Sequence, residues 1–205
     1  MVKHIYLVRH GETDFNTDPV PRIRGRVMNP LNELGRKHAR EVGEALKDVR
    51  LDLIYYSAIT RAKQTAEAIH AHQPQAKYIE EPLVIDISWG DWEGKTYAEA
   101  FGTKEREELF KRDPAQLEIP NGESFYQVLA RLEKLLHQIR ESAEETVCIV
   151  SHGAVLNLLM CMITEAPLRS FWVFYGGACS ISQIDLNDNG TFSIKSYNRM
   201  EHLTN

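Results

Sequence analysis

The chain has 205 residues, of which 43% are hydrophobic and 26% are charged, and its formal net charge at pH 7 is −5. This length fits one well-packed domain or two small ones, and the composition is typical of a soluble globular protein. The negative charge excludes proteins that bind by broad neutralisation of phosphate, so we expect no nucleic-acid partner. Any phosphate chemistry in this chain must depend on local positive charge.

The start of the chain and the cysteines indicate where the protein works. Residues 5–8 form a run of only four apolar residues, which is too short for a signal-peptide core or a membrane span. We therefore expect no membrane association. Cys148, Cys161 and Cys179 are odd in number and lack a CxxC pairing. They are predicted to be buried free thiols in a reducing cytoplasm.

Short apolar runs alternate with longer helical patterns along the whole chain, which indicates an α/β fold with a largely parallel central sheet. Strands are predicted at residues 4–9, 51–57, 76–80, 146–152, 179–185 and 191–197. Helices are predicted at residues 33–49, 60–70, 103–112, 124–142 and 154–164. Neither an internal repeat nor a linker interrupts this order, so we expect a single domain over residues 1–205.

Residues 81–122 differ from their flanks because they are richer in Trp, Gly and acidic residues. They show no evident core of their own. We interpret this segment as a lid-like insertion over a site. Its Trp89, together with Phe171 and Trp172 later in the chain, either lines a pocket for an apolar leaving group or belongs to a core.

Two predicted strands end in the same way. Arg9, His10 and Gly11 follow the first strand, and His152 and Gly153 follow the fourth. The carboxyl ends of parallel strands lie along one edge of a sheet, where ligands bind. Each glycine lets the backbone turn and lets its N–H groups approach a ligand. A single histidine at a strand end can equally be a backbone cap, but the repetition favours two histidines that meet across a cleft.

A third element follows the second predicted strand. Ser57 or Thr60 is expected to cap a helix that carries Arg61 in its first turn. A cation is unfavourable there because the helix dipole is positive at its N-terminus. An anion bound at this helix end would resolve the conflict, and an exposed arginine on the helix face is the alternative.

Six segments in a fixed order resemble a known family. They are "LVRHGETDFN", "RIRGRVMNPLNELGRKHA", "SAITRAKQTAEAI", "GDWEGKT", "NGESF" and "VSHG". Together they are similar to the histidine phosphatase superfamily, in particular its phosphoglycerate mutase-like branch, over nearly the whole chain. The resemblance implies a three-layer α/β/α sandwich with a mostly parallel central sheet, and catalysis through a phosphohistidine.

The same resemblance implies roles for individual residues. His10 would be the nucleophile, and a neutral imidazole with a reference pKa of about 6.5 needs little activation at neutral pH. Arg9, Arg61 and His152 would surround the phosphoryl group, and arginine suits this role because its planar fork grips two oxygens. Further donors are expected from the Asn16 amide and from the backbone of Gly153 and Ala154. This set requires no metal and no other cofactor.

The acid that protonates the leaving oxygen departs from the family pattern. Asp86 stands where the family usually places a Glu shortly before a Gly-x-Trp-Glu-Gly segment. Aspartate is one methylene shorter, so the backbone must come closer or another carboxylate must act. The other candidates are Glu80, Glu81, Asp91 and Glu93. The alternative interpretation of Asp86 is a loop cap.

A second departure is Arg24, which precedes Gly25 where relatives often carry a small polar residue or Gln. With Arg22 and Arg26 it would make the mouth of the pocket basic. Both Arg24 and Gly25 are predicted to contact substrate. This hypothesis favours small phosphorylated acids over neutral phosphoesters, and the alternative is a solvated charged loop.

The sequence therefore predicts a cytoplasmic, metal-independent phosphatase that hydrolyses small phosphorylated metabolites and exists as a monomer or a homodimer. Hydrolysis is favoured over mutase action because the segment after Glu93 is short, and a short lid admits water to a phosphoenzyme. Alternatives within the family are an adenosylcobalamin or α-ribazole phosphatase, a phosphoserine phosphatase and a phosphoglycerate mutase. Outside enzymes, the alternative is a regulatory protein that binds phosphoesters without turnover.

Overall fold

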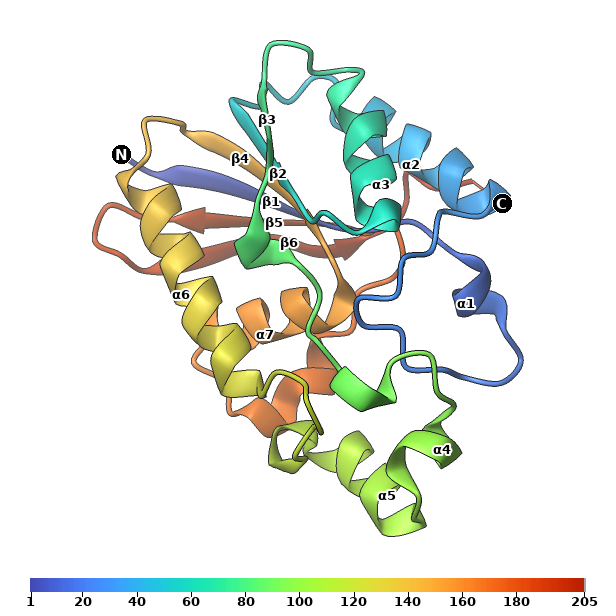
Figure 1. Ribbon diagram of the computed structural model, residues 1–205. Helices are drawn as coiled ribbons and strands as arrows, with labels where there is room; N and C mark the ends of the chain where they lie inside the picture. The colour runs from blue at the N-terminus through green and yellow to red at the C-terminus, as the bar shows by residue number, and fades with distance from the viewer. Residues whose placement is uncertain (205) are drawn as a thin grey trace.

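A computed structural model describes residues 1–204 and contains one six-stranded sheet between layers of helices (Figure 1). The strands are β1 (Lys3–Arg9), β2 (Leu53–Tyr56), β3 (Lys77–Glu80), β4 (Thr146–Ser151), β5 (Ile181–Leu186) and β6 (Phe192–Arg199). Their order in the sheet is β3-β2-β4-β1-β5-β6. Every neighbouring pair among β3, β2, β4 and β1 is parallel, whereas β5 runs antiparallel to both β1 and β6. The predicted strands and the mostly parallel sheet are confirmed.

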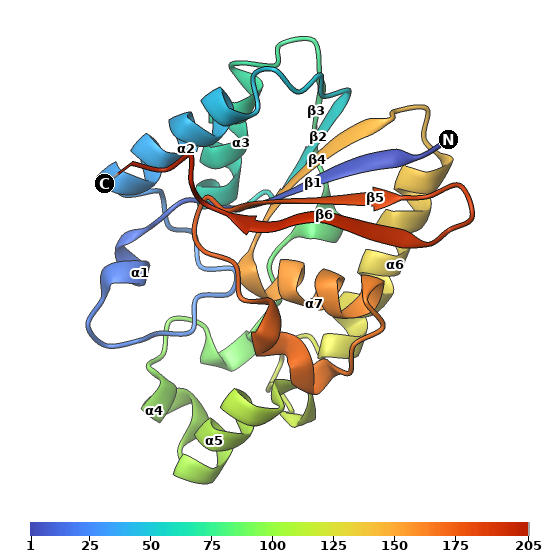
Figure 2. The same ribbon diagram turned by 180° about the vertical axis from the view of Figure 1, so that it is seen from behind.

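Helices cover both faces of this sheet. The helices of the described chain are α1 (Asp14–Thr17), α2 (Glu33–Ala45), α3 (Thr60–His70), α4 (Tyr97–Phe101), α5 (Lys104–Arg112), α6 (Phe125–Glu141) and α7 (Gly153–Ile163). Short 3-10 helices lie at η1 (Pro82–Val84), η2 (Gly90–Trp92), η3 (Pro114–Gln116) and η4 (Leu168–Phe174). The helices α2 and α3 pack on one face, while α6 and α7 pack on the other (Figures 1 and 2). This arrangement is the predicted three-layer sandwich.

The central strands are buried on both faces, which explains why they are almost entirely apolar. Along β1, Ile5 and Leu7 belong to the core on the α6 and α7 side, and Val8 belongs to the core on the α2 and α3 side. Along β2, Tyr55 belongs to the core on the α6 and α7 side, and Ile54 belongs to the core on the α2 and α3 side. Successive side chains of a strand point to opposite faces, so one short apolar run serves two cores.

Residues 81–122 lie beyond the carboxyl ends of the parallel strands, where α4 and α5 project from the sandwich (Figure 1). Their aromatic side chains share a core with α6 and η4. Trp89 packs edge-on against Phe110 and Phe125, with ring centroids 5.6 and 6.1 Å apart. Phe125 in turn contacts Phe171. The core of this segment is therefore continuous with the core beneath the sheet.

The sequence gives two further expectations: that no segment spans a membrane and that the cysteines are buried free thiols. In the described part of the chain, no single helix is long and apolar enough to cross a membrane; α7 and η4 meet that criterion only when taken together as a sharply bent pair. Cys148, Cys161 and Cys179 are buried free thiols, as predicted. Burial raises the pKa of Cys148 to about 12.

Candidate active site

The two strand ends that carry histidines lie side by side. Because β1 and β4 are parallel neighbours, Arg9 is in register with Ser151, and the N–H of His10 donates to the Ser151 carbonyl at 2.9 Å. The rings of His10 and His152 are consequently 5.2 Å apart between centroids. Both histidines are buried. The backbone ladder thus places two imidazoles at one edge of the sheet, as the sequence predicts.

The hydrogen bonds of His10 define which of its nitrogens is free to react. The Nε–H of Arg61 donates to Nε2 of His10 at 3.2 Å, so Nε2 is the unprotonated nitrogen. The proton is on Nδ1, which donates to the carbonyl of Gly11 at 2.8 Å. Burial lowers the pKa of His10 well below its usual value, and the charges of Arg61 and Arg9 lower it further. His10 is therefore a neutral imidazole whose Nε2 lone pair faces the cationic groups.

Arg61 is completely buried, so the alternative of an exposed helix-face arginine is wrong. Its Nη1 donates to the Val27 carbonyl at 2.9 Å and to Oδ1 of Asn29 at 2.7 Å. Its Nη2 donates to the Gly25 carbonyl at 2.7 Å and to Oδ2 of Asp86 at 2.9 Å. These contacts fix the guanidinium between the end of β1 and two loops.

The predicted capping of α3 is wrong. Neither Ser57 nor Thr60 is the N-cap, because Ile59 occupies that position and makes no side-chain cap. The hydroxyl of Ser57 instead accepts from the N–H of Ile59 at 3.3 Å and lies 2.7 Å from Nε2 of His152. Ser57 therefore fixes the plane of the His152 ring.

The ring of His152 lies beside that of His10, and the residue is almost fully buried. Its Nδ1 is 3.5 Å from Oδ2 of Asp86 and has no hydrogen-bond partner within residues 1–204. Burial lowers the pKa of His152 well below the usual value, and the Arg61 charge adds to the effect. A neutral imidazole thus lies beside the carboxyl group of Asp86.

Among the five carboxylates considered for the acid, Asp86 alone lines the cavity described below. Glu80 and Asp91 are exposed, Glu81 binds Gln138, and Glu93 accepts from the N–H of Trp89. Burial raises the pKa of Asp86, although the neighbouring Arg61 opposes the shift. A carboxyl group with a raised pKa can hold a proton for a leaving oxygen.

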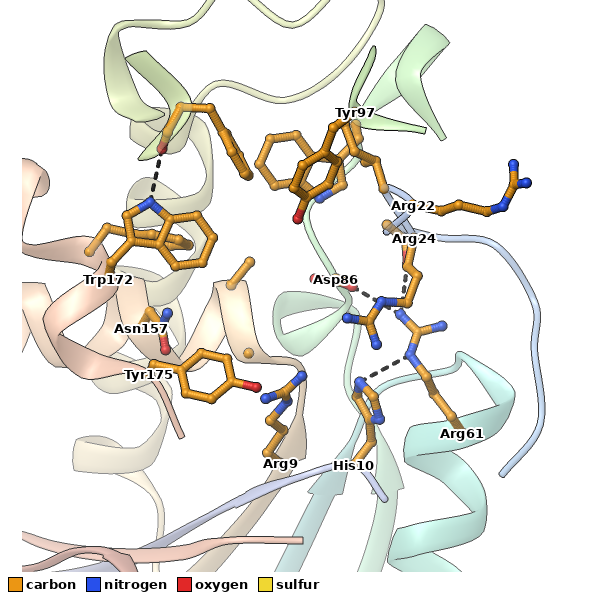
Figure 3. Close-up of a pocket in the computed structure, with 17 residues that line it drawn as sticks. Arg9, His10, Arg22, Arg24, Arg61, Asp86, Tyr97, Asn157, Trp172 and Tyr175 are labelled. Carbon is orange, nitrogen blue, oxygen red and sulfur yellow. Dashed lines mark hydrogen bonds and ion pairs between the residues drawn. The ribbon is translucent and has the colours of Figure 1, made fainter. Parts of the chain in front are cut away.

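These groups surround a cavity of about 300 Å³ at the carboxyl edge of the sheet (Figure 3). The predicted site residues on its wall are Arg9, His10, Arg24, Gly25, Arg61, Asp86, Gly153 and Ala154. Trp89, Phe171 and Trp172 also line it, so they serve both the pocket and the core. Segments distant in sequence therefore converge on one site.

The structure does not bring Asn16 to this cavity. Its Oδ1 accepts from the N–H of Thr13 at 3.0 Å and from the Thr13 hydroxyl at 2.9 Å. This reciprocal pairing is a capping box that starts α1. Asn16 is expected to donate to the phosphoryl group through its amide, whereas the contacts of its side chain are local ones, made by the amide oxygen.

Three polar residues on the cavity wall had no part in the sequence-based site: Tyr97, Asn157 and Tyr175. Asn157 is four residues after Gly153 on α7, so it occupies the same helix face, and this spacing was a usable signal. Tyr97 and Tyr175 come from segments far apart in the chain. The ring of Tyr175 lies 5.2 Å from the guanidinium of Arg9. No local pattern announces that contact.

Several buried donors at the site have no acceptor within residues 1–204. They include Nε of Arg9, Nη1 of Arg24 and Nδ1 of His152. Leaving buried donors unpaired is costly, and it is common where a ligand supplies the missing acceptors. Arg9 is otherwise fixed through Nη1, which donates to the Gly176 carbonyl at 2.5 Å. The unpaired donors lie around a neutral His10, and such a set of donors suits a ligand rich in acceptor oxygens.

Comparison with known proteins identifies the family. A model of the histidine phosphatase superfamily (branch 1) matches residues 5–199. Phosphoserine phosphatase 1 of Hydrogenobacter thermophilus is 32% identical over 95% of this chain and 92% of its own. The metal-independent phosphoserine phosphatase of Arabidopsis thaliana is 34% identical over 99% of this chain and 84% of its own. The solved structure of Bacillus stearothermophilus YhfR is 33% identical, with a TM-score of 0.89 and coverage of 98% and 100%.

The chain therefore belongs to the histidine phosphatase superfamily, in its phosphoglycerate mutase-like branch. Its class of activity is that of a phosphoric monoester hydrolase. Within residues 1–204, no three His, Cys, Asp or Glu side chains are grouped so as to hold a metal ion.

Proposed function

We propose that the protein is a metal-independent phosphatase of small phosphomonoesters that works through a phosphohistidine at His10. The observation that carries this proposal is the unprotonated Nε2 of His10, which faces Arg61 at 3.2 Å. A nucleophile that is neutral and held in one tautomer needs no separate base. The cavity of about 300 Å³ is at the small end for ligand pockets, which favours a small metabolite.

In the first step, Nε2 of His10 attacks phosphorus while the bond to the leaving oxygen breaks. Asp86 gives its proton to that oxygen, so the alcohol leaves neutral. The Nε–H of Arg61, which donates to Nε2 of His10 before substrate binds, then donates to a phosphoryl oxygen instead. The unpaired donors of Arg9 and His152 bind the other equatorial oxygens. Donors aimed at developing charge lower the barrier because they need no reorientation.

In the second step, water attacks the phosphorus of phospho-His10, and the P–N bond breaks. The Asp86 carboxylate accepts the proton of the water, which regenerates the acid for the next cycle. Phosphate leaves, and Nε2 regains its lone pair. The Gly11 carbonyl keeps the proton on Nδ1 throughout both steps.

The proposal includes a single domain in which residues 81–122 act as a lid. Two observations support this lid. Trp89 and Tyr97 lie on the cavity wall, and the aromatic side chains of the segment share a core with α6. The segment is short, so water should reach the phosphoenzyme, which favours hydrolysis over mutase action. The free buried thiols support a reducing, cytoplasmic location. A monomer or a homodimer remains our expectation.

The names of the relatives suggest which phosphomonoesters to test first. Two of them are named phosphoserine phosphatases, which favours a small phosphorylated acid as substrate. A mutase or an α-ribazole phosphatase is the alternative within the family. A panel of phosphorylated metabolites, assayed for phosphate release in the presence of a chelator, would rank them.

Rapid quench with a radiolabelled phosphomonoester tests the mechanism. We expect an acid-labile label on the protein, steady phosphate release in the presence of a chelator, and loss of both in His10→Ala. The exposed His137 offers a matched control, and His137→Ala should behave like the wild type. Activity that survives His10→Ala, or that needs an added divalent metal, would overturn the mechanism. Binding without label would instead indicate a regulatory binding protein.

A further inference from the structure

The loop between α1 and α2 delivers one arginine into the cavity. Gly25 has a positive φ of 49°, and a Cβ there would lie 2.5 Å from Oε1 of Glu93 and 2.8 Å from Cδ1 of Trp89. The loop is therefore pressed against the lid segment, which only glycine permits. Arg24, the residue before this turn, directs its guanidinium toward the space between Asp86 and His10 (Figure 3).

The four arginines of the cavity differ in what already binds them. Arg22 donates to Oδ2 of Asp18 at 3.0 Å and to the Gly94 carbonyl at 3.2 Å, and its guanidinium points away from the centre (Figure 3). Arg61 is paired with a carboxylate at 2.9 Å. Nη1 of Arg24, in contrast, is buried and has no partner within residues 1–204. Arg24 is therefore available to a ligand.

A count of charge shows that the phosphoryl group does not use all of these cations. When Asp86 is protonated, as the first step requires, the guanidiniums of Arg9, Arg24 and Arg61 are not neutralised by it. A phosphomonoester carries a charge of about −1.5 to −2 at neutral pH. About one positive charge is left over, which a singly charged carboxylate would neutralise.

The surroundings of Arg24 indicate that it is the cation whose charge the phosphoryl group does not neutralise. Among the three arginines, Arg24 contributes least to the lowered pKa of His10, after Arg61 and Arg9. Burial lowers the pKa of Arg24 itself, with a further contribution from Arg9, whereas Asp86, Tyr97 and Tyr175 act in the opposite direction. Arg24, Tyr97 and Tyr175 all line the cavity, so the two tyrosines belong to the wall that Arg24 faces.

We propose that Arg24 selects substrates whose leaving group carries a carboxylate, which it binds in the cavity that it lines together with Tyr97 and Tyr175. This inference rests on the proposed phosphatase function and assigns its substrate class. A planar guanidinium suits a carboxylate because it donates two parallel hydrogen bonds. Lysine or glutamine at the same position would lose that geometry.

Two pairs of phosphomonoesters isolate the carboxylate. Phosphoserine and phosphoethanolamine differ only by that group, and 3-phosphoglycerate differs from glycerol 3-phosphate by a carboxylate in place of a hydroxymethyl group. The measurement is the ratio of kcat/KM within each pair for the wild type, Arg24→Gln and Arg24→Lys. Each ratio comes from one preparation, so a partly folded variant does not distort it.

We expect the wild type to prefer the acid of each pair and Arg24→Gln to reduce that preference at least about tenfold, as loss of a charged hydrogen bond implies. Arg24→Lys should recover part of it. Arg40→Gln removes the same charge from an exposed position on α2, away from the cavity, and is the matched control, with an unchanged ratio. An equal loss on both members of a pair would overturn the proposal, since Arg24 would then act on the phosphoryl group.

A wild type that releases phosphate from p-nitrophenyl phosphate but shows no preference within either pair would also overturn it. The proposed function fails in a different way. In that case the wild type would release phosphate from none of these esters, or His10→Ala would remain active. The two failures are therefore distinguishable in one set of assays.

Discussion

The edge of the sheet and the loops that cover it contribute to the same cavity but are built differently. Arg9 and His10 continue a central strand that is hydrogen-bonded on both sides. Arg24 and Tyr97 come from a loop and from the start of a five-residue helix. Groups on a rigid element are held more accurately than groups on loops. His10, the proposed nucleophile, is therefore held by the rigid strand. Arg24 and Tyr97, which are proposed to lie around the leaving group, are held by the covering loop and short helix.

The largest expected effect is the difference between variants of two arginines, Arg61 and Arg24. Arg61→Ala should lower the free energy of unfolding by about 3–5 kcal/mol, because it leaves Asp86 buried without its partner. It should also reduce kcat by at least about 10²-fold through loss of a donor to the phosphoryl group. Arg24→Gln should change stability by less than about 1 kcal/mol. Urea denaturation of both variants is the measurement, and equal losses would contradict the distinction.

Asp86→Asn tests the acid that the loops supply. For an alkyl phosphate, kcat/KM should fall by about 10²–10⁴-fold, whereas p-nitrophenyl phosphate should be affected much less because its leaving group needs no proton. The acid must be protonated, so wild-type activity should fall as pH rises through the raised pKa of Asp86. Asp86→Glu should retain part of the activity. A pH profile that is identical in Asp86→Asn would assign the acid elsewhere.

Ser57→Ala should have a smaller effect, since Ser57 acts through His152. Loss of the hydroxyl releases the ring, and we expect kcat to fall about tenfold with little change in KM, an effect the size of one hydrogen bond. Thr60→Ala removes a hydroxyl from the same helix start and is the control. A change confined to KM would show that Ser57 shapes substrate binding instead.

The smallest effect concerns stability against pH. The pKa values of His10 and His152 are lowered in the folded chain, so the unfolded chain binds more protons below about pH 6.5. The free energy of unfolding should then decrease as pH falls, by up to about 1.4 kcal/mol per pH unit for each histidine. The raised pKa of Asp86 acts in the opposite direction. His152→Asn should reduce the slope, and the exposed His137→Asn should not.

Most of the fold is predictable because its signals are local. The central strands contain short apolar runs, and α2 and α6 have an amphipathic period, so both signals survive without tertiary information. The meeting of His10 and His152 is also predictable, since parallel strands end at one edge. The family resemblance supplied Arg9, Arg61 and Asp86, whose positions on or near the cavity agree with it while their roles stay predictions.

The remaining features depend on competition or on distant contacts. Asn16 is assigned to the site by the family resemblance, whereas its Oδ1 pairs with the nearby Thr13 and the residue does not line the cavity. Ser57 looked like a helix cap because its contact with His152 spans 95 residues. Tyr97 and Tyr175 reach the cavity only after the lid and η4 have packed, and no period or motif encodes that.

The reversed strand β5 has a consequence for biosynthesis. Because β5 starts where the parallel strands end, the segment before it reaches the nucleophile edge, and Gly176 binds Arg9 across 167 residues of chain. β1 is synthesised first, but in the sheet it lies between β4 and β5. Its hydrogen bonds on both sides therefore cannot form until β5 has been synthesised. Contacts of such long range slow folding. A nascent chain should thus have no phosphatase activity until its C-terminal strands emerge, and truncation before β5 should leave an edge that recruits chaperones.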